Sequence, residues 1–215
     1  MQIVDAIQSI ARGCESVQAV MNTSGKESEN RFRLAIESLN RLAMEQGIPI
    51  AIIGGLGAIR YGYPAATEDI DILVSKIDLE RLIHHASEYD FRVVWQAASG
   101  WHTLSYRDVE INVVPQGSRA KNSSPTLIPS PMEVGVSQGV GYASLEGWME
   151  LKLSTARQKD KAHIVEVLKK CDSGDVVKIR KHIHSIHPTY EALLEELIVA
   201  ANEEAENEKD RGHNR

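Results

Sequence analysis

Two aspartates that alternate along a short apolar run are the residues in this chain best placed to do chemistry. Asp69 and Asp71 flank Ile70 in the run EDIDILV. Side chains alternate along a β-strand, so both carboxylates project from one face while Ile70 points to the other. Adjacent carboxylates repel each other unless a positive charge lies between them, and hard divalent cations prefer oxygen ligands. The pair therefore predicts a site for Mg²⁺ or Mn²⁺.

A third carboxylate is expected from a later strand, because two-metal sites for phosphoryl chemistry usually share their ions among several acids. In the run DVEINV, residues 108–113, apolar residues alternate with Asp108, Glu110 and Asn112. The apolar residues form the predicted core face, which leaves the three polar residues on the opposite face. Glu110 is central in this strand and is the first candidate, and Asp108, at the turn, is the second.

The elements that must position these residues follow from hydrophobic periodicity and turn signals. Helical spacing predicts helices over residues 1–21, 28–46, 79–88 (capped by Asp78), 144–155 (with Ser144 as its capping residue), 160–170, 175–184 and 189–207. Alternation and β-branched residues predict strands over residues 50–53, 70–74, 91–95, 101–106, 109–114 and 134–140, and Gly54-Gly55 is predicted as a tight turn before a helix that starts at residue 56. These elements predict an α+β fold with a mixed sheet flanked by helices. The expected organisation is an N-terminal helical extension (1–47), a core (48–143) and a C-terminal helical region (144–215).

Composition excludes several classes of protein. Of the 215 residues, 42% are hydrophobic and 25% are charged, which is typical of a globular domain. No apolar run approaches the roughly 20 residues that span a membrane, and the first residues do not resemble a signal peptide, so we expect a cytoplasmic protein with no membrane association. Cys14 and Cys171 are far apart, which argues against a disulfide framework or a zinc site. A net charge of −6 argues against broad, non-specific nucleic-acid binding but leaves a local basic groove open.

The spacing of these motifs resembles a known family. A Gly-Gly pair at 54–55, thirteen intervening residues, Asp-x-Asp and a later strand acid resemble the nucleotidyltransferase superfamily related to polymerase β. The run IIGGLGAIRYGYPAATEDIDILV is most similar to the minimal nucleotidyltransferases of the AbiEii-like toxin type. A downstream helix with the pattern LKLSTARQKDK, residues 151–161, also fits that family. The resemblance covers about residues 50–170.

The resemblance implies a Mg²⁺-dependent (or Mn²⁺-dependent) enzyme that moves a nucleoside monophosphate from an NTP to an acceptor and releases pyrophosphate. It implies that the acids hold the metal and act in catalysis, that the glycine backbone approaches the phosphates, and that the basic side chains neutralise phosphate charge. The implied catalytic and metal-binding residues are Asp69, Asp71 and Glu110, and the implied nucleotide-binding residues are Gly54, Gly55, Lys152 and, more weakly, Arg157.

The sequence departs from the family pattern at two positions. Many members have a serine hydroxyl where Gly55 stands, and the third acid is usually the shorter aspartate rather than Glu110. These departures keep a second hypothesis open, in which the chain is a catalytically inactive nucleotide- or partner-binding module on the same fold. The acceptor is expected to be RNA or a protein, with a small molecule compatible with the same motif, and a cognate toxin or antitoxin is the expected partner.

Aromatic residues in the predicted strands have a structural and a functional interpretation. Trp95, Trp101 and Tyr106 could stack on a nucleobase, but aromatic side chains in strands are more often part of the core, which is the prediction adopted here. Arg119 and Lys121 lie in a polar loop and could contact an acceptor, although such a loop needs no ligand to explain it.

Overall fold

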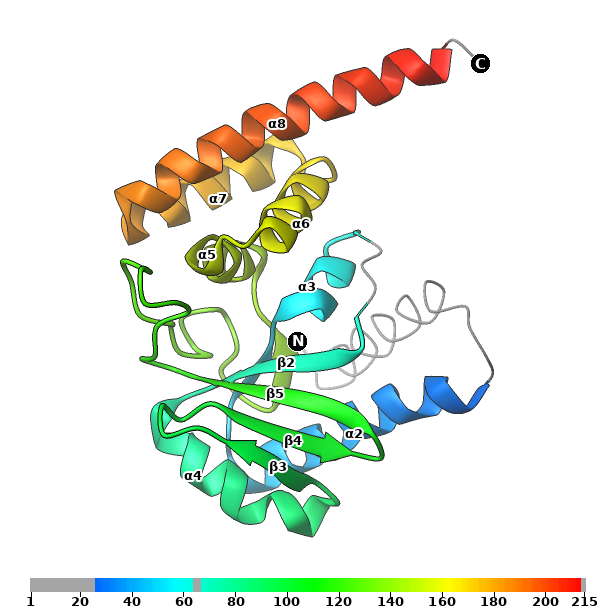
Figure 1. Cartoon of the computed structure of the whole chain (residues 1–215), viewed down its shortest axis with the longest axis vertical. Coiled ribbons are helices and arrows are strands. Elements are labelled where there is room, and N and C mark those ends of the chain that lie inside the picture. Colours follow the sequence, from blue (N-terminus) through cyan, green and yellow to red (C-terminus); the bar gives the residue numbers. More distant parts are fainter. Residues whose placement is uncertain (1–25, 64–66, 214–215) are drawn as a thin grey trace.

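The computed structural model describes residues 26–63 and 67–213, and within this part the chain forms an α+β fold around a six-stranded mixed sheet (Figure 1). The predicted helix over residues 1–21 lies outside the described residues. The strands are β1 (Ile50–Ile52), β2 (Asp69–Val74), β3 (Arg92–Gln96), β4 (His102–Tyr106), β5 (Val109–Pro115) and β6 (Val140–Tyr142). The helices are α2 (Lys26–Gln46), α3 (Gly54–Arg60), α4 (Lys76–His85), the 3₁₀ turn η1 (Ala86–Tyr89), α5 (Leu145–Thr155), α6 (Gln158–Leu168), α7 (Ser173–Ile186) and α8 (Pro188–His213).

The order of strands across the sheet is β3-β4-β5-β2-β1-β6, which places the two aspartates of β2 in the middle. β2 runs parallel to β5 and pairs Asp69 with Glu110 and Asp71 with Asn112. The other neighbouring pairs are antiparallel, except that β1 and β6 are parallel. The parallel register between β2 and β5 therefore decides which polar residue of β5 lies beside each aspartate.

On the face of the sheet opposite the aspartates, buried apolar side chains fix the orientation of the strands. Ile70 and Ile72 of β2 are completely buried, as is Ile111 of β5. Burying one such side chain contributes roughly 1.5–3 kcal/mol, and a slip of the register by one residue would put carboxylates in the core. The two aspartates must therefore face away from this core, toward the side of the sheet where α3 and the helical layer α5–α8 lie (Figure 1).

Three predictions about the elements were wrong in detail. Residues 134–138 are not a strand: Val134, Val136 and Val140 are buried, which mimics strand alternation, but Gly135 and Gly139 adopt positive φ and break the extended run, so that only β6 pairs with the sheet. Helix α3 begins at Gly54, within the predicted turn. Helix α4 is capped by Ser75, whose hydroxyl accepts from the N–H of Asp78, so Asp78 lies inside the helix. The predicted cap of α5 is confirmed, since Ser144 Oγ accepts from the N–H of Gly147 at 3.1 Å.

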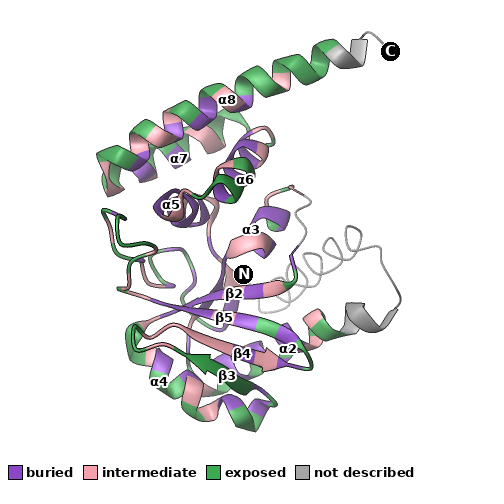
Figure 2. Cartoon of the chain, viewed as in Figure 1, coloured by how far each residue is buried: buried purple, intermediate pink, exposed green. Residues whose placement is uncertain are grey.

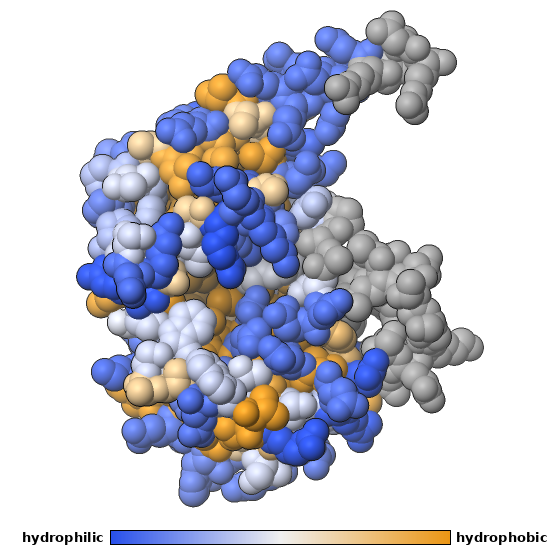
Figure 3. Space-filling view, in the orientation of Figure 1, coloured by the Kyte–Doolittle hydropathy of each residue, from blue (hydrophilic) through white to orange (hydrophobic). Residues whose placement is uncertain are grey.

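The edge of the sheet formed by β3 is open to solvent. Strand β3 lies at one edge and is exposed along its whole length (Figure 2). Figure 3 shows hydrophobic residues at the surface in this region, where Val93 and Val94 are exposed.

None of the helices in the described ranges combines the length and the apolar character needed to cross a membrane.

Candidate active site

A cavity of about 500 Å³ lies between the aspartate face of the sheet, the start of α3 and the helices α5 and α6. Most of the site residues expected from the sequence line it, namely Gly54, Gly55, Asp69, Asp71, Lys152 and Arg157. Glu110 is not among its lining residues. The structure thus brings together residues from seven elements, namely α3, β2, β3, β4, β5, α5 and α6, and from the segment before β2, and it leaves one expected residue outside.

Asn112 bridges the two aspartates. Its Nδ2 atom donates to Asp69 Oδ2 at 3.0 Å and to Asp71 Oδ1 at 3.3 Å. Burial and the neighbouring Asp69 raise the pKa of Asp71 above its ordinary value, although the hydrogen bond from Asn112 acts in the opposite direction. The amide thus satisfies lone pairs of both carboxylates and partly offsets their repulsion.

Glu110 stands beside Asp69 in the strand register but is exposed and outside the cavity. Across residues 26–63 and 67–213, no three His, Cys, Asp or Glu side chains gather in a way that could hold a metal ion. The side chain that reaches both aspartates is therefore Asn112, which the parallel register places beside Asp71, whereas Glu110, beside Asp69 in the same register, is exposed and does not line the cavity. The sequence placed Asn112 on the correct face, but only the register shows that it touches both aspartates.

The donor set suits one hard divalent cation better than two. Asp69 and Asp71 offer carboxylate oxygens, and Asn112 offers an amide oxygen if its side chain turns over, since the amide oxygen and nitrogen occupy similar positions. Thr103 Oγ1 lies 3.4 Å from Asn112 Oδ1 and is the hydrogen-bond partner that such a rotation would exchange. Mg²⁺ or Mn²⁺ fits these oxygen ligands.

Gly54 packs directly against Asp71. Its φ is +65°, and a Cβ atom built on it would lie 1.9 Å from Asp71 Oδ2, a distance that no side chain tolerates. The Nε1 atom of Trp148, on α5, donates to the Gly54 carbonyl at 3.0 Å and holds the turn from the other side. Glycine is therefore required here both for its backbone conformation and for the close approach of the carboxylate.

Thr67 occupies the space that a side chain at Gly55 would fill. A Cβ atom built on Gly55 would lie 2.8 Å from Thr67 Oγ1. Thr67 is buried, lines the cavity, and donates through Oγ1 to Asp69 Oδ1 at 3.0 Å. A hydroxyl is thus present beside the turn although Gly55 has none. Sequence reasoning missed Thr67, yet its position two residues before Asp69 was a signal, because such residues share a face of an extended chain.

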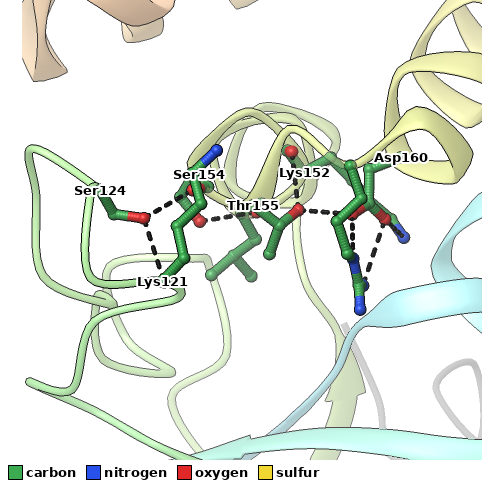
Figure 4. Close-up of polar contacts among 8 residues, drawn as sticks. Lys121, Ser124, Lys152, Ser154, Thr155 and Asp160 are labelled. Atoms are coloured by element: carbon green, nitrogen blue, oxygen red, sulfur yellow. Dashed lines mark hydrogen bonds and ion pairs between the residues drawn. The ribbon is translucent and has the colours of Figure 1, made fainter.

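A buried carboxylate organises the basic side of the cavity (Figure 4). Asp160 is 0% exposed and accepts from Lys152 Nζ at 2.8 Å, Thr155 Oγ1 at 2.6 Å and Arg157 Nε at 2.7 Å. Burial raises its pKa, but the hydrogen bonds and charges of Arg157 and Lys152 outweigh burial and hold the pKa of Asp160 well below its usual range. Asp160 is therefore an ionised counter-ion inside the protein.

The two expected phosphate-binding cations differ in availability. Lys152 is buried and forms its ion pair with Asp160, so its charge is largely compensated. The side chain of Arg157 is 72% exposed, also borders the cavity, and interacts electrostatically with Asp71 and Asp69. Arg157 also pairs with Asp160 but is the more exposed of the two cations, and the phosphate-binding role expected for each of them stays a prediction.

His163 is a further lining residue that the sequence did not single out. It lies on α6, is 5% exposed and packs against the Tyr63 ring with 5.5 Å between ring centroids. Its Nδ1 atom is buried and has no hydrogen-bond partner. Burial and then the charges of Lys152 and Lys159 lower the pKa of His163 to about 4. The imidazole is therefore neutral near neutral pH.

Two tryptophans from the sheet side contribute an aromatic wall to the cavity. Trp95 of β3 and Trp101, just before β4, both line it. The prediction that Trp95 belongs to the core was wrong: it is 54% exposed, because β3 is the edge strand of the sheet. Lys121, from the loop after β5, borders the same cavity.

Comparisons with known proteins identify structural neighbours only. No protein-family model and no curated protein matches the sequence. The solution structure of antibiotic-resistance factor ANT(2'')-Ia aligns over 85% of this chain and 98% of its own, at a TM-score of 0.43 and 15% identity. The Thermotoga maritima CCA-adding enzyme complexed with tRNA aligns over 84% of this chain and 49% of its own, at a TM-score of 0.35 and 14% identity. At these scores the likeness carries no argument about activity, which has to rest on the site itself.

Proposed function

We propose that the protein is a nucleotidyltransferase that moves a nucleoside monophosphate from an NTP to a hydroxyl acceptor. The observation that carries this proposal is the meeting, in one cavity, of the Asp69–Asp71 pair with the Gly54-Gly55 turn and with Arg157. Carboxylates for a cation, a glycine turn at a helix start and an exposed guanidinium are the three groups that hold a triphosphate. The resemblance of residues 50–170 to minimal nucleotidyltransferases supports the same activity.

In this proposal each residue has a role set by its position. Asp69 and Asp71 hold Mg²⁺ or Mn²⁺, with Asn112 as a neighbouring oxygen donor. A divalent ion bound there supplies charge neutralisation at the triphosphate. The backbone at Gly54 and Gly55 lies against the phosphates, Arg157 contacts them, and Lys152 with Asp160 holds the end of α5 in place. The acceptor oxygen forms a bond to the α-phosphorus, the bond from that phosphorus to pyrophosphate breaks, and the hydroxyl proton passes to solvent.

A second candidate function is favoured by one observation. The side chain that touches both aspartates is an amide and not a third carboxylate. A site with two acids keeps enough negative charge to bind a metal–nucleotide complex, but it lacks a charge that two-metal catalysis normally uses. The alternative is therefore a nucleotide- or partner-binding module with little or no turnover. In either case the AbiEii-like resemblance leads us to propose a cognate toxin or antitoxin as partner.

Incubation of the purified protein with Mg²⁺ or Mn²⁺ and each of the four α-³²P-labelled NTPs tests the proposal. Total RNA is supplied in one set and lysate protein in another. The matched control is Asp71→Asn, which keeps the shape of the side chain and removes its charge. Label in RNA or protein that is absent with Asp71→Asn supports the enzyme. Nucleotide binding without label in any acceptor supports the binding module and contradicts the enzyme.

A further inference from the structure

A row of residues leads across the sheet from the aspartates to the exposed tryptophan. Asp71 pairs with Asn112, Asn112 pairs with Thr103, and Thr103 pairs with Trp95, so that four adjacent strands contribute one residue each. All four residues line the cavity. Neighbouring strands lie about 4.8 Å apart, which places Trp95 ~14 Å from Asp71 along this row.

A β-bulge aims Trp95 at this face. Val93 pairs with Leu104 and Trp95 pairs with Thr103, which leaves Val94 as the extra residue of β3. Without the bulge, Val94 would stand opposite Thr103 and Trp95 would point to the other side of the sheet. Bulges recur beside active sites, where they redirect a side chain. The β-bulge at Val94 thus places the Trp95 ring on the face of the sheet that lines the cavity.

The charges around this wall match an anion. Lys121, Arg157 and Lys159 are exposed cations at the cavity. The carboxylates that line it are already engaged: Asp69 by Thr67 and Asn112, Asp71 by Asn112, and Asp160 by Lys152 and Arg157. The cavity-lining residues of the neighbouring strand β4 and the residue just before it are His102, Thr103 and Trp101, none of which is acidic, and Lys121 lines the same cavity. A polycationic acceptor would need carboxylates on this wall, whereas a nucleic-acid strand needs a ring to stack on and a cation for its phosphates.

The loop that carries Lys121 is held in place from α5 (Figure 4). Ser124, which is 1% exposed, donates through Oγ to the Ser154 carbonyl at 2.7 Å, and the same oxygen accepts from the Lys121 N–H at 3.2 Å. The Lys121 backbone is therefore tied through Ser124 to the C-terminal turn of α5. This anchoring holds a cation at the same cavity that Trp95 lines.

We propose that the Trp95 wall binds the 3′ end of a single-stranded RNA acceptor, with a base stacked on Trp95 and a backbone phosphate beside Lys121. This inference rests on the proposed nucleotidyl transfer, since it names the acceptor for the same cavity. The distance of ~14 Å between Trp95 and Asp71 leaves room for the strand to run from the stacked base to a terminal hydroxyl near the aspartates.

Fluorescence anisotropy with a 5′-fluorescein-labelled, unstructured 12-nucleotide RNA tests this inference. Trp95→Ala should weaken RNA binding by about 5- to 100-fold, the range of one stacked base, whereas Trp95→Phe should retain most of it. Val94→Ala is the matched control, because Val94 is an exposed neighbour on the same strand that does not line the cavity. Lys121→Ala should weaken binding and reduce its salt dependence by about one phosphate contact.

The outcomes separate this inference from the proposed function. Absence of RNA binding by the parent protein, or equal binding by Trp95→Ala and Val94→Ala, overturns the inference. Weaker NTP binding by Trp95→Ala with unchanged RNA binding overturns it too and assigns the wall to the base of the NTP. Label transferred to protein and never to RNA makes the acceptor a protein. If RNA binding depends on Trp95 but the parent transfers no nucleotide to any acceptor, the Trp95 wall is an RNA-binding surface, and the transferase activity, together with the acceptor role of that RNA, is overturned.

Discussion

Asn112 Nδ2 lies 3.0 Å from Asp69 Oδ2, across the parallel pair of β5 and β2. The same nitrogen lies 3.3 Å from Asp71 Oδ1, so one neutral amide holds two carboxylates together. A carboxylate at this position would add repulsion to the empty site and affinity to the metal-loaded one. The residue at position 112 therefore affects two properties in opposite directions: the stability of the metal-free protein and its affinity for a metal ion.

Substitution Asn112→Asp should change both properties. We expect the metal-free protein to lose about 1–3 kcal/mol of stability, because a bridging donor becomes a third negative charge. We also expect Mg²⁺ or Mn²⁺ to raise its Tm more than that of the parent, since metal binding to the native state stabilises it by mass action, and the transfer rate to rise at least about tenfold. Thermal melts across a metal titration and the labelled-NTP assay measure both effects.

Glu110→Gln is the control for this substitution. Its side chain is exposed and outside the cavity, so we expect neither the metal-dependent Tm nor the transfer rate to change. Loss of transfer in Glu110→Gln would instead restore Glu110 as the third acid, the role that the resemblance gave it.

Gly54→Ala should be far more damaging than Gly47→Ala. Both glycines have positive φ, +65° and +63°, so both substitutions strain the backbone by roughly 1–2 kcal/mol. A Cβ atom at Gly54 would also collide with Asp71 Oδ2, whereas nothing lies within 4 Å of one at Gly47. Urea unfolding should show that Gly54→Ala loses about 1–3 kcal/mol more stability than Gly47→Ala. A separate binding measurement should show that Gly54→Ala no longer binds NTP. Equal losses at the two positions would mean that Asp71 moves aside at little cost.

Gly55→Ser should be tolerated only when Thr67 is shortened. The single substitution forces a Cβ atom to within 2.8 Å of Thr67 Oγ1 and should destabilise the protein by about 1–3 kcal/mol. In Gly55→Ser with Thr67→Gly, which removes both Thr67 Oγ1 and the Thr67 Cβ atom at 2.9 Å, the new side chain takes the vacated space, so we expect much of this stability to return. A double-mutant cycle in urea measures the coupling. A coupling energy near zero would show that the two side chains do not share one space.

Lys152→Met and Arg157→Ala should separate stability from nucleotide binding. Loss of Lys152 leaves the buried Asp160 with one cation fewer, and breaking a buried ion pair costs about 3–5 kcal/mol. Arg157 also pairs with Asp160, but its side chain is 72% exposed and water can take its place, so its removal should cost less, about 1–2 kcal/mol of stability. We expect Arg157→Ala to raise the Kd for NTP about tenfold. Measurement of the free energy of unfolding and of NTP binding for both variants decides this, and the reverse pattern would return the phosphate role to Lys152.

Stability should fall with acid through His163. Its folded pKa of about 4 lies below the unfolded value of 6.5, because it is buried beside Tyr63 and faces Lys152, Lys159 and Arg157, with Asp160 acting in the opposite direction. Between pH 6.5 and 4 the unfolded state binds the extra proton, so this contribution is complete above pH 6.5 and is lost as pH falls, by up to ~3 kcal/mol. Urea unfolding from pH 7.5 to 4.5 should show a smaller loss for His163→Gln than for the parent. Equal losses would mean that His163 is free to protonate in the folded protein.

The sequence alone determined the local parts of this site. Strand alternation placed Asp69 and Asp71 on one face and Ile70 in the core, and helical periodicity located most of the helices to within a few residues. These features depend on neighbours along the chain, so a short window of sequence contains them. The same holds for the cap at Ser144, whose hydrogen bond spans three residues.

The tertiary structure decided everything that depends on pairing between distant segments. The choice of Asn112 over Glu110 follows from the register of two strands that lie about forty residues apart, and the outward aim of Trp95 follows from a bulge at a sheet edge. The engagement of Lys152 by Asp160 required the turn between α5 and α6 to bring the two buried charges together. Composition and periodicity show which face a residue occupies, but not which residue of another segment lies beside it, because that choice depends on packing over the whole core.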